Sequence, residues 1–128
     1  MATKVLIVDD EETFRNMMKV SLEDTGDFEV QTERNPNKAI EVALRFKPDV
    51  FILDIIMPEM SGFELLEKIK KNSDLQQTPA IYVTGFVDGC DRTGGKFPDS
   101  IDGVPSLRKP IYVEEIIDAI KRIGEGPD

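Results

Sequence analysis

Several polar side chains stand immediately after short, largely apolar segments of the chain: Asp9, Asp10, Asp54, Thr84 and Lys109. If those segments are strands of one parallel sheet, their carboxyl ends meet at a single edge, where ligands of such sheets bind. Carboxylates, a hydroxyl and an ammonium would then face one another. Such a set can bind a metal ion and can accept a phosphoryl group.

The acids among these residues favour a divalent cation. Two like charges about 4 Å apart repel by several kcal/mol in a protein-like dielectric, and a bound cation removes that cost. Oxygen ligands without histidine or cysteine select Mg²⁺ over zinc, with Ca²⁺ and Mn²⁺ as alternatives. Asp9 and Asp10 are adjacent and suit the metal. Lys109 would pair with whichever carboxylate does not bind the metal.

A carboxylate beside Mg²⁺, an ammonium and a hydroxyl can accept a phosphoryl group and form an acyl phosphate. Asp54 is the expected nucleophile, because it stands alone after its apolar run. Mg²⁺ and Lys109 would neutralise the phosphoryl oxygens, and the Thr84 hydroxyl would donate a hydrogen bond to one of them.

Each of these residues also has an ordinary structural explanation. The acidic run 9–12 can cap the helix that follows it and complement the helix dipole. A single Asp after a strand is common turn chemistry, and Lys-Pro is a common loop pair. The case for function depends on four such positions, the Asp9-Asp10 pair, Asp54, Thr84 and Lys109, following four different strands of one sheet, which turn preferences do not explain.

The chain as a whole predicts alternating strands and helices. Short apolar runs predict strands at 5–8, 28–32, 50–53, 80–83 and 104–107. Helical spacing of apolar residues predicts helices around 14–22, 36–44, 62–69 and 113–123. Strands that alternate with helices form a parallel sheet with helices on both faces. We therefore expect a doubly wound α/β fold.

The composition excludes several classes of function. The chain has 128 residues and a formal net charge of −9, so direct nucleic-acid binding is not expected. The absence of histidine and the single cysteine, Cys90, exclude histidine-based catalysis, an internal disulfide and cysteine-rich zinc sites. No apolar run is long enough to span a membrane, and the amino terminus does not resemble a signal peptide. We expect one domain over residues 1–128, with a frayed tail at about 125–128, in the cytoplasm.

Four segments of the chain carry a family pattern. They are Val-Leu-Ile-Val-Asp-Asp-Glu at 5–11, Asp-Ile-Ile-Met-Pro-Glu-Met-Ser-Gly at 54–62, Val-Thr-Gly at 83–85 and Lys-Pro at 109–110. In these segments the chain resembles the receiver domain of two-component response regulators, over about residues 4–84 and 104–123. The resemblance implies a flavodoxin-like, five-stranded parallel sheet with strand order 2-1-3-4-5. It also implies a signalling switch rather than a turnover enzyme.

The resemblance gives the acids specific roles. Asp54 matches the phosphoacceptor of the family. Asp9 and Asp10 match its acidic Mg²⁺ site, in which Asp54 and the backbone carbonyl of Ile56 would be further ligands. These assignments agree with the chemistry expected from the residue types alone.

The resemblance also implies how the switch and its partners work. Thr84 matches the switch hydroxyl, which moves toward the phosphoryl group, and Lys109 matches the active-site lysine. Pro110 matches a proline that often follows a cis peptide bond in the family. The phosphoryl donor would be a sensor histidine kinase or a phosphotransfer protein. The output would pass to a downstream protein that the sequence does not identify.

Two departures from the family pattern lie toward the last strand. Ser106 stands where family members usually carry Tyr or Phe, whose ring moves inward with the threonine; Phe86, Phe97 and Tyr112 are candidate substitutes. The segment 88–99, rich in glycine and acids, takes the place of the fourth helix, and we expect a loop or at most a turn or two of helix there. Both departures bear on the family's usual output surface, formed by the fourth helix and the fifth strand.

Other functions compete with a switch phosphorylated on Asp54. An interaction module could keep the fold and signal without phosphorylation, and Ser106 together with the irregular segment 86–105 is the reason for that alternative. A phosphohydrolase of the haloacid-dehalogenase type also uses an Asp nucleophile and Mg²⁺, but its Asp-x-Asp-x-Thr motif meets Glu11 at the third position. A phosphate-binding loop fails on spacing, because Gly95 separates the preceding glycine from Lys96.

Overall fold

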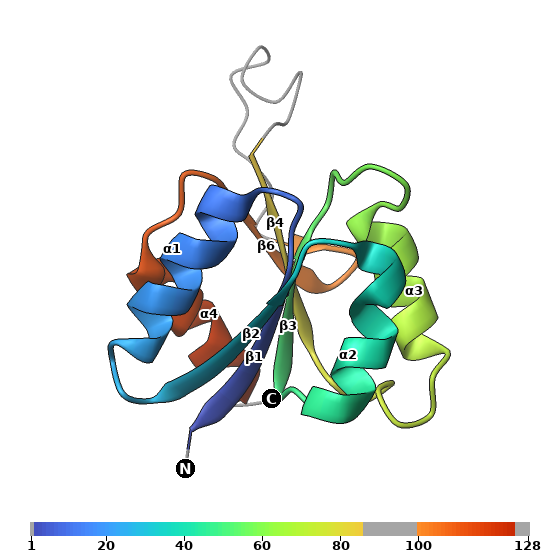
Figure 1. The fold of residues 1–128 in the computed structure, drawn as a ribbon, viewed down its shortest axis with the longest axis horizontal. Coiled ribbons are helices and arrows are strands. Elements are labelled where there is room, and N and C mark those ends of the chain that lie inside the picture. The colour runs from blue at the N-terminus through green and yellow to red at the C-terminus, as the bar shows by residue number, and fades with distance from the viewer. Residues whose placement is uncertain (1, 86–99, 125–128) are drawn as a thin grey trace.

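The computed structural model describes residues 2–85 and 100–124. In these ranges a twisted sheet is flanked by helices on both faces (Figure 1). The strands are β1 (Thr3–Val8), β2 (Phe28–Glu33), β3 (Val50–Asp54), β4 (Ala80–Thr84), β5 (Ser100–Ile101) and β6 (Val104–Arg108). The helices are α1 (Glu12–Glu23), the 3₁₀ turn η1 (Pro36–Lys38), α2 (Ala39–Phe46), α3 (Gly62–Lys70) and α4 (Val113–Gly124).

The strand order confirms the predicted doubly wound sheet. The order is β2-β1-β3-β4-β6-β5, and every neighbouring pair from β2 to β6 is parallel. Strand β6 is the fifth strand expected from the sequence, so the five-stranded parallel order 2-1-3-4-5 is present. The predicted irregular segment 88–99 and the predicted frayed tail 125–128 lie outside the described residues.

The short strand β5 is an addition that the sequence analysis did not predict. It pairs antiparallel with β6, with Ser100 opposite Pro105 and Ile101 opposite Val104. The turn between the two strands is Asp102-Gly103, whose φ angles are 52° and 81°. Positive φ at both turn residues is what a tight type I′ hairpin requires.

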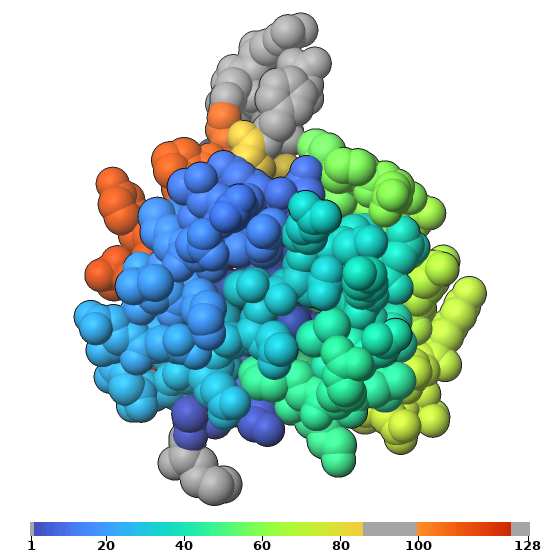
Figure 2. All heavy atoms as spheres, viewed as in Figure 1, coloured from blue at the N-terminus to red at the C-terminus, as the bar shows by residue number. Residues whose placement is uncertain are grey.

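The sheet separates two apolar layers. Helices α1 and α4 cover one face, and α2 and α3 cover the other (Figure 1). Because both faces are covered, Val5–Val8 of β1 and Val50–Asp54 of β3 are buried along their whole length. Side chains fill the spaces between the ribbons, as the space-filling view shows over α1, β2 and α2 (Figure 2).

Local sequence explains where the helices begin. The Asn35 side chain accepts a hydrogen bond from Asn37 N–H at 2.9 Å ahead of η1 and α2. Ser61 and Glu64 form a reciprocal capping box at the start of α3. In α3, Leu65, Leu66 and Ile69 make the buried stripe, whereas Phe63 is 43% exposed. Among the described residues, no helix combines the length and the apolar character needed to cross a bilayer.

Candidate functional site

The carboxyl edge of the sheet brings the predicted acids together. Val8 and Leu53 are register partners, so Asp9 and Asp54 leave adjacent strands side by side. One carboxylate oxygen from each of Asp9, Asp10 and Asp54 lies within 4.8 Å of the other two. Asp9 and Asp54 are buried, whereas Asp10 is exposed. The result is a set of oxygen ligands with one side open to solvent.

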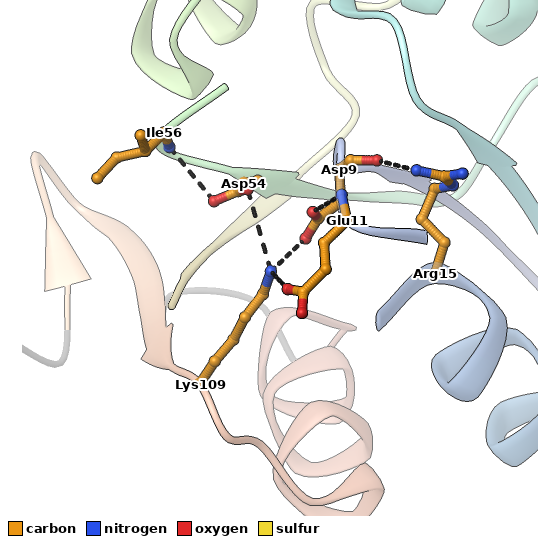
Figure 3. Close-up of polar contacts among 6 residues, drawn as sticks. All are labelled: Asp9, Glu11, Arg15, Asp54, Ile56 and Lys109. Carbon is orange, nitrogen blue, oxygen red and sulfur yellow. Dashed lines mark hydrogen bonds and ion pairs between the residues drawn. The ribbon is translucent and has the colours of Figure 1, made fainter. Parts of the chain in front are cut away.

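The turn from β1 into α1 holds Asp9 in one orientation. The backbone N–H of Glu11 donates to Asp9 Oδ1 at 2.8 Å, and Arg15 Nη1 donates to the Asp9 carbonyl oxygen at 2.7 Å (Figure 3). The N–H of Asp9 donates to the Glu33 carbonyl oxygen of β2 at 3.2 Å. Asp9 is therefore oriented by its neighbours before any ligand binds.

Asp54 is buried at the end of the central strand, and its charge is costly there. The Ile56 N–H donates to Asp54 Oδ1 at 3.3 Å, while the Ile55 N–H continues the strand ladder to the Val83 carbonyl oxygen at 2.9 Å. Burial, followed by the charge of Asp9, raises the pKa of Asp54 to about 7. The Lys109 charge and the Ile56 N–H offset only part of that shift. A cation bound beside Asp54 would favour its ionised form.

Gly62 allows α3 to begin against the segment that carries Asp54. Its N–H donates to the Ile55 carbonyl oxygen at 2.9 Å. A Cβ atom at this position would overlap the Asp54 carbonyl oxygen and crowd the Ile55 backbone. A side chain at position 62 would therefore displace the loop that shapes the site.

Lys109 reaches the acids from the end of β6 (Figure 3). Its Nζ lies 2.7 Å from Asp9 Oδ2, 2.9 Å from Glu11 Oε1 and 4.0 Å from Asp54 Oδ2. The same Nζ lies 4.3 Å from the centre of the Phe14 ring. Burial alone would lower the pKa of Lys109, but hydrogen bonds to Asp9 and Glu11 and the acidic charges outweigh burial and raise it. The ammonium is therefore charged at neutral pH.

Thr84 lies at the end of β4 and Ile56 just after the end of β3, at the same edge of the sheet. Thr84 is buried as the last residue of β4, and its carbonyl oxygen accepts a hydrogen bond of 2.8 Å from the Lys109 N–H. The Lys109–Pro110 peptide bond is cis, as the resemblance implies. The Ile56 side chain is 55% exposed, next to the carboxylate that its N–H contacts. The structure therefore places every predicted site residue at one edge of the sheet.

Glu11 is the residue of the site that the sequence analysis missed. Helix capping is the ordinary structural explanation of the acidic run 9–12, yet Glu11, at the N-cap of α1, makes no side-chain capping hydrogen bond. Its carboxylate binds Lys109 instead. The signal was present in the sequence, because an ammonium facing several acids can pair with more than one of them.

The chemistry of the donor set fits Mg²⁺. The clustered atoms are all carboxylate oxygens, which are hard ligands, and one of the acids remains open to water. A shallow hollow of about 320 Å³ lies beside the set, lined by Glu11, Thr13, Phe14, Met17, Gly85, Lys109, Pro110 and Ile111. A larger hollow of about 670 Å³ lies by Thr3, Asp49 and Pro79, at the opposite end of the strands from the acids. An exposed site of this kind suits a reacting group presented by a large partner.

The sequence matches a family and several named relatives. The response regulator receiver domain family matches residues 5–121. A response regulator Rre1 from Synechocystis is 30% identical over 78% of this chain and 48% of its own length. A polar-differentiation response regulator DivK from Brucella anthropi is 32% identical over 94% of this chain and 95% of its own length. The chain spans about half or less of the length of the first curated relatives that it matches.

Solved structures show the same arrangement of elements. The chemotaxis protein CheY4 of Vibrio cholerae matches with a TM-score of 0.79 and 29% identity, covering 96% of this chain and 99% of that chain. The receiver domain of a signal transduction histidine kinase from Syntrophus aciditrophicus matches with a TM-score of 0.77 and 31% identity, covering 98% of this chain and 92% of that chain.

Proposed function

Because the chain belongs to the family of response regulator receiver domains, we propose that it is a signalling switch phosphorylated on Asp54. One observation supports this most strongly: Asp54 is buried between Asp9 and Lys109, with its pKa raised to about 7. A buried acid whose pKa is shifted by burial and by specific charged neighbours is typical of functional sites. We infer one receiver domain over residues 1–128, acting in the cytoplasm as a switch and not as a turnover enzyme.

Mg²⁺ would be held by the carboxylates of Asp9, Asp10 and Asp54, with the Ile56 carbonyl as a further ligand. When bound, it would neutralise charge on the phosphoryl oxygens. The ligand set supports this choice because it contains only oxygen atoms and lacks the nitrogen and sulfur ligands that zinc prefers.

The phosphoryl donor is a phosphohistidine on a sensor histidine kinase or a phosphotransfer protein, as expected for the family to which the chain belongs. An Asp54 carboxylate oxygen attacks the phosphorus, the phosphorus–nitrogen bond breaks, and the imidazole leaves with the electron pair and takes up a proton. Lys109 pairs with one phosphoryl oxygen, and the Thr84 hydroxyl donates a hydrogen bond to another. The Asp54 carboxylate must be ionised to attack.

Phosphorylation acts as a bias between two conformations. It adds charge and acceptor oxygens at Asp54 and recruits Thr84 and Lys109. Such a modification shifts a pre-existing equilibrium by about 1–3 kcal/mol, which is enough to change the affinity for a downstream protein several-fold. The downstream partner reads the altered surface.

The experiment that tests this function is phosphoryl labelling with a small donor. Wild type should take up one hydroxylamine-labile phosphoryl group, only when Mg²⁺ is present. Asp54→Asn should abolish the label, because the nucleophilic carboxylate is gone. Equal labelling of the Asn variant would show that another residue accepts the phosphoryl group.

A second candidate is an interaction module that signals without phosphorylation. Ser106 supports it, because a small buried residue stands where the family usually has the switching ring. Adding Mg²⁺ with beryllofluoride, a mimic of the phosphoryl group, separates the two candidates. Amide resonances that stay in place would favour the second, and shifts reaching β4 and β6 would favour the switch.

A further inference from the structure

Lys109 lies between the phosphoacceptor candidate and two other acids. Its Nζ is 2.9 Å from Glu11 Oε1 and 2.7 Å from Asp9 Oδ2, but 4.0 Å from Asp54 Oδ2. Figure 3 shows the ammonium close to the Asp9 and Glu11 carboxylates. The lysine is therefore hydrogen-bonded to Asp9 and Glu11, whereas its ion pair with Asp54 is longer than a hydrogen bond.

The two acids that hold Lys109 are not equivalent. The Asp9 carboxylate is fully buried and belongs to the clustered oxygens that could bind a cation. The Glu11 side chain is 56% exposed and, among the described residues, lies outside that cluster. A cation would compete with Lys109 for Asp9 but not for Glu11. Glu11 can therefore retain the ammonium when a cation is bound.

Helix capping does not explain where the Glu11 side chain lies. Glu11 has extended backbone angles at the N-cap of α1, and its side chain makes no capping hydrogen bond there. Glu12 already supplies negative charge to the first turn of the helix. Lys109 is the side chain that Glu11 contacts.

We propose that Glu11 is a positioning residue that holds the Lys109 ammonium away from Asp54 until a phosphoryl group forms there. The proposal rests on the function proposed above. On phosphorylation the Glu11 ion pair opens, and the ammonium pairs with a phosphoryl oxygen on Asp54. Because this ion pair must open, Glu11 slows phosphoryl transfer and favours the unphosphorylated arrangement.

The test compares the rate of labelling by a small phosphoryl donor at saturating Mg²⁺ in three variants. Glu11→Gln should react about two- to fivefold faster, the range expected for an ion pair with one exposed partner. Glu11→Asp keeps the charge but is too short to keep the 2.9 Å contact, so it should also react faster. Glu12→Gln makes the same charge change on the first turn of α1 and should stay within about 1.5-fold of wild type.

A second measurement follows the lysine itself. The ¹⁵Nζ resonance of Lys109, assigned with Lys109→Arg, should shift in both Glu11 variants and stay in place in Glu12→Gln. If Glu11→Gln reacts at the wild-type rate, or if Glu11→Asp behaves as wild type, Glu11 has no positioning role while the proposed function stands. If wild type takes up no label at all, the proposed function falls and the role of Glu11 falls with it.

Discussion

The β1–β3 side and the β4–β6 side of the sheet differ in how closely they keep the family pattern. At the ends of β1 and β3 lie the acids that the resemblance implies, Asp9, Asp10 and Asp54, and one carboxylate oxygen of each lies within 4.8 Å of the other two. At β4 and β6, the ring that the family usually places at position 106 is absent, and β5 adds an antiparallel edge. The residues proposed for the chemistry are thus all present on one side, and the departures from the family pattern lie on the other.

The altered side has its own compensation in packing. Ser106 is the register partner of Tyr82 on β4, so the two side chains share one face of the sheet. Tyr82 is buried and meets the Phe63 ring edge-on at 5.1 Å. On this face, therefore, the large aromatic side chain belongs to β4, and β6 carries the small Ser106 at the position where the family usually has a ring. Among the described residues, the acids therefore cluster as predicted even though position 106 departs from the family pattern.

The largest effect is expected for Gly62→Ala, which would disturb the backbone that carries Asp54 on the acidic side. The new Cβ would overlap the Asp54 carbonyl oxygen, and backbone atoms cannot move aside cheaply. We expect a loss of about 3 kcal/mol in the free energy of unfolding, measured by urea denaturation. Glu67→Ala, on the exposed side of the same helix, is the control and should change it by less than about 0.5 kcal/mol. A Gly62→Ala variant as stable as this control would contradict the packing argument.

Asp54→Asn should have the opposite effect on stability, because the charge of Asp54 is costly without a cation. The pKa of Asp54 rises from its ordinary 3.8 to about 7 on folding, so the folded chain holds this proton more tightly than the unfolded chain. Its contribution to stability is complete below about pH 4 and is lost as the pH rises through about 7. We expect the Asn variant to gain about 2 kcal/mol over wild type at pH 8 and almost nothing at pH 4.

Urea denaturation of wild type and Asp54→Asn across this pH range measures the difference directly. Adding Mg²⁺ at pH 8 should reduce the difference in the free energy of unfolding between the two proteins, since a cation would stabilise only the ionised carboxylate. If this difference in the free energy of unfolding is the same at pH 4 and pH 8, burial of the Asp54 charge does not cost stability.

Ser106→Tyr tests the other side of the comparison. A second large ring opposite Tyr82 would overpack a buried face, and we expect a loss of about 1.5 kcal/mol in the free energy of unfolding. Combining it with Tyr82→Leu should recover most of that loss, because the volume then returns to β6. If Ser106→Tyr alone leaves the free energy of unfolding unchanged, this face has spare room. That result would contradict the argument that Tyr82 already fills the space beside position 106.

The sequence predicted the parallel sheet because its short apolar runs alternate with segments of helical spacing, and the edge where Asp9 and Asp54 meet follows from that topology. It did not predict the Glu11–Lys109 contact, because the reach of two long side chains depends on how α1 and β6 approach each other. Strand β5 was missed because two residues are too few to show alternation. The Asp102-Gly103 dipeptide was nevertheless a hairpin signal.

The smallest effect is expected at Ile56, which lies at the outer rim of the acidic side. Ile56 is 55% exposed, and its N–H contacts the Asp54 carboxylate. Its apolar sec-butyl side chain would therefore stand beside the path of water to a phosphoryl group on Asp54. Ile56→Asn replaces this apolar group with one that can hydrogen-bond water. We expect the phosphorylated variant to lose its label about threefold faster, a change of about 0.7 kcal/mol in the barrier. The decay of label after removal of the donor measures this rate, and Glu59→Gln, at an exposed position of the same loop, is the control. If wild type lost the label faster than Ile56→Asn, the side chain would not shield the acyl phosphate, and the lifetime would be set by the acids and Lys109 alone.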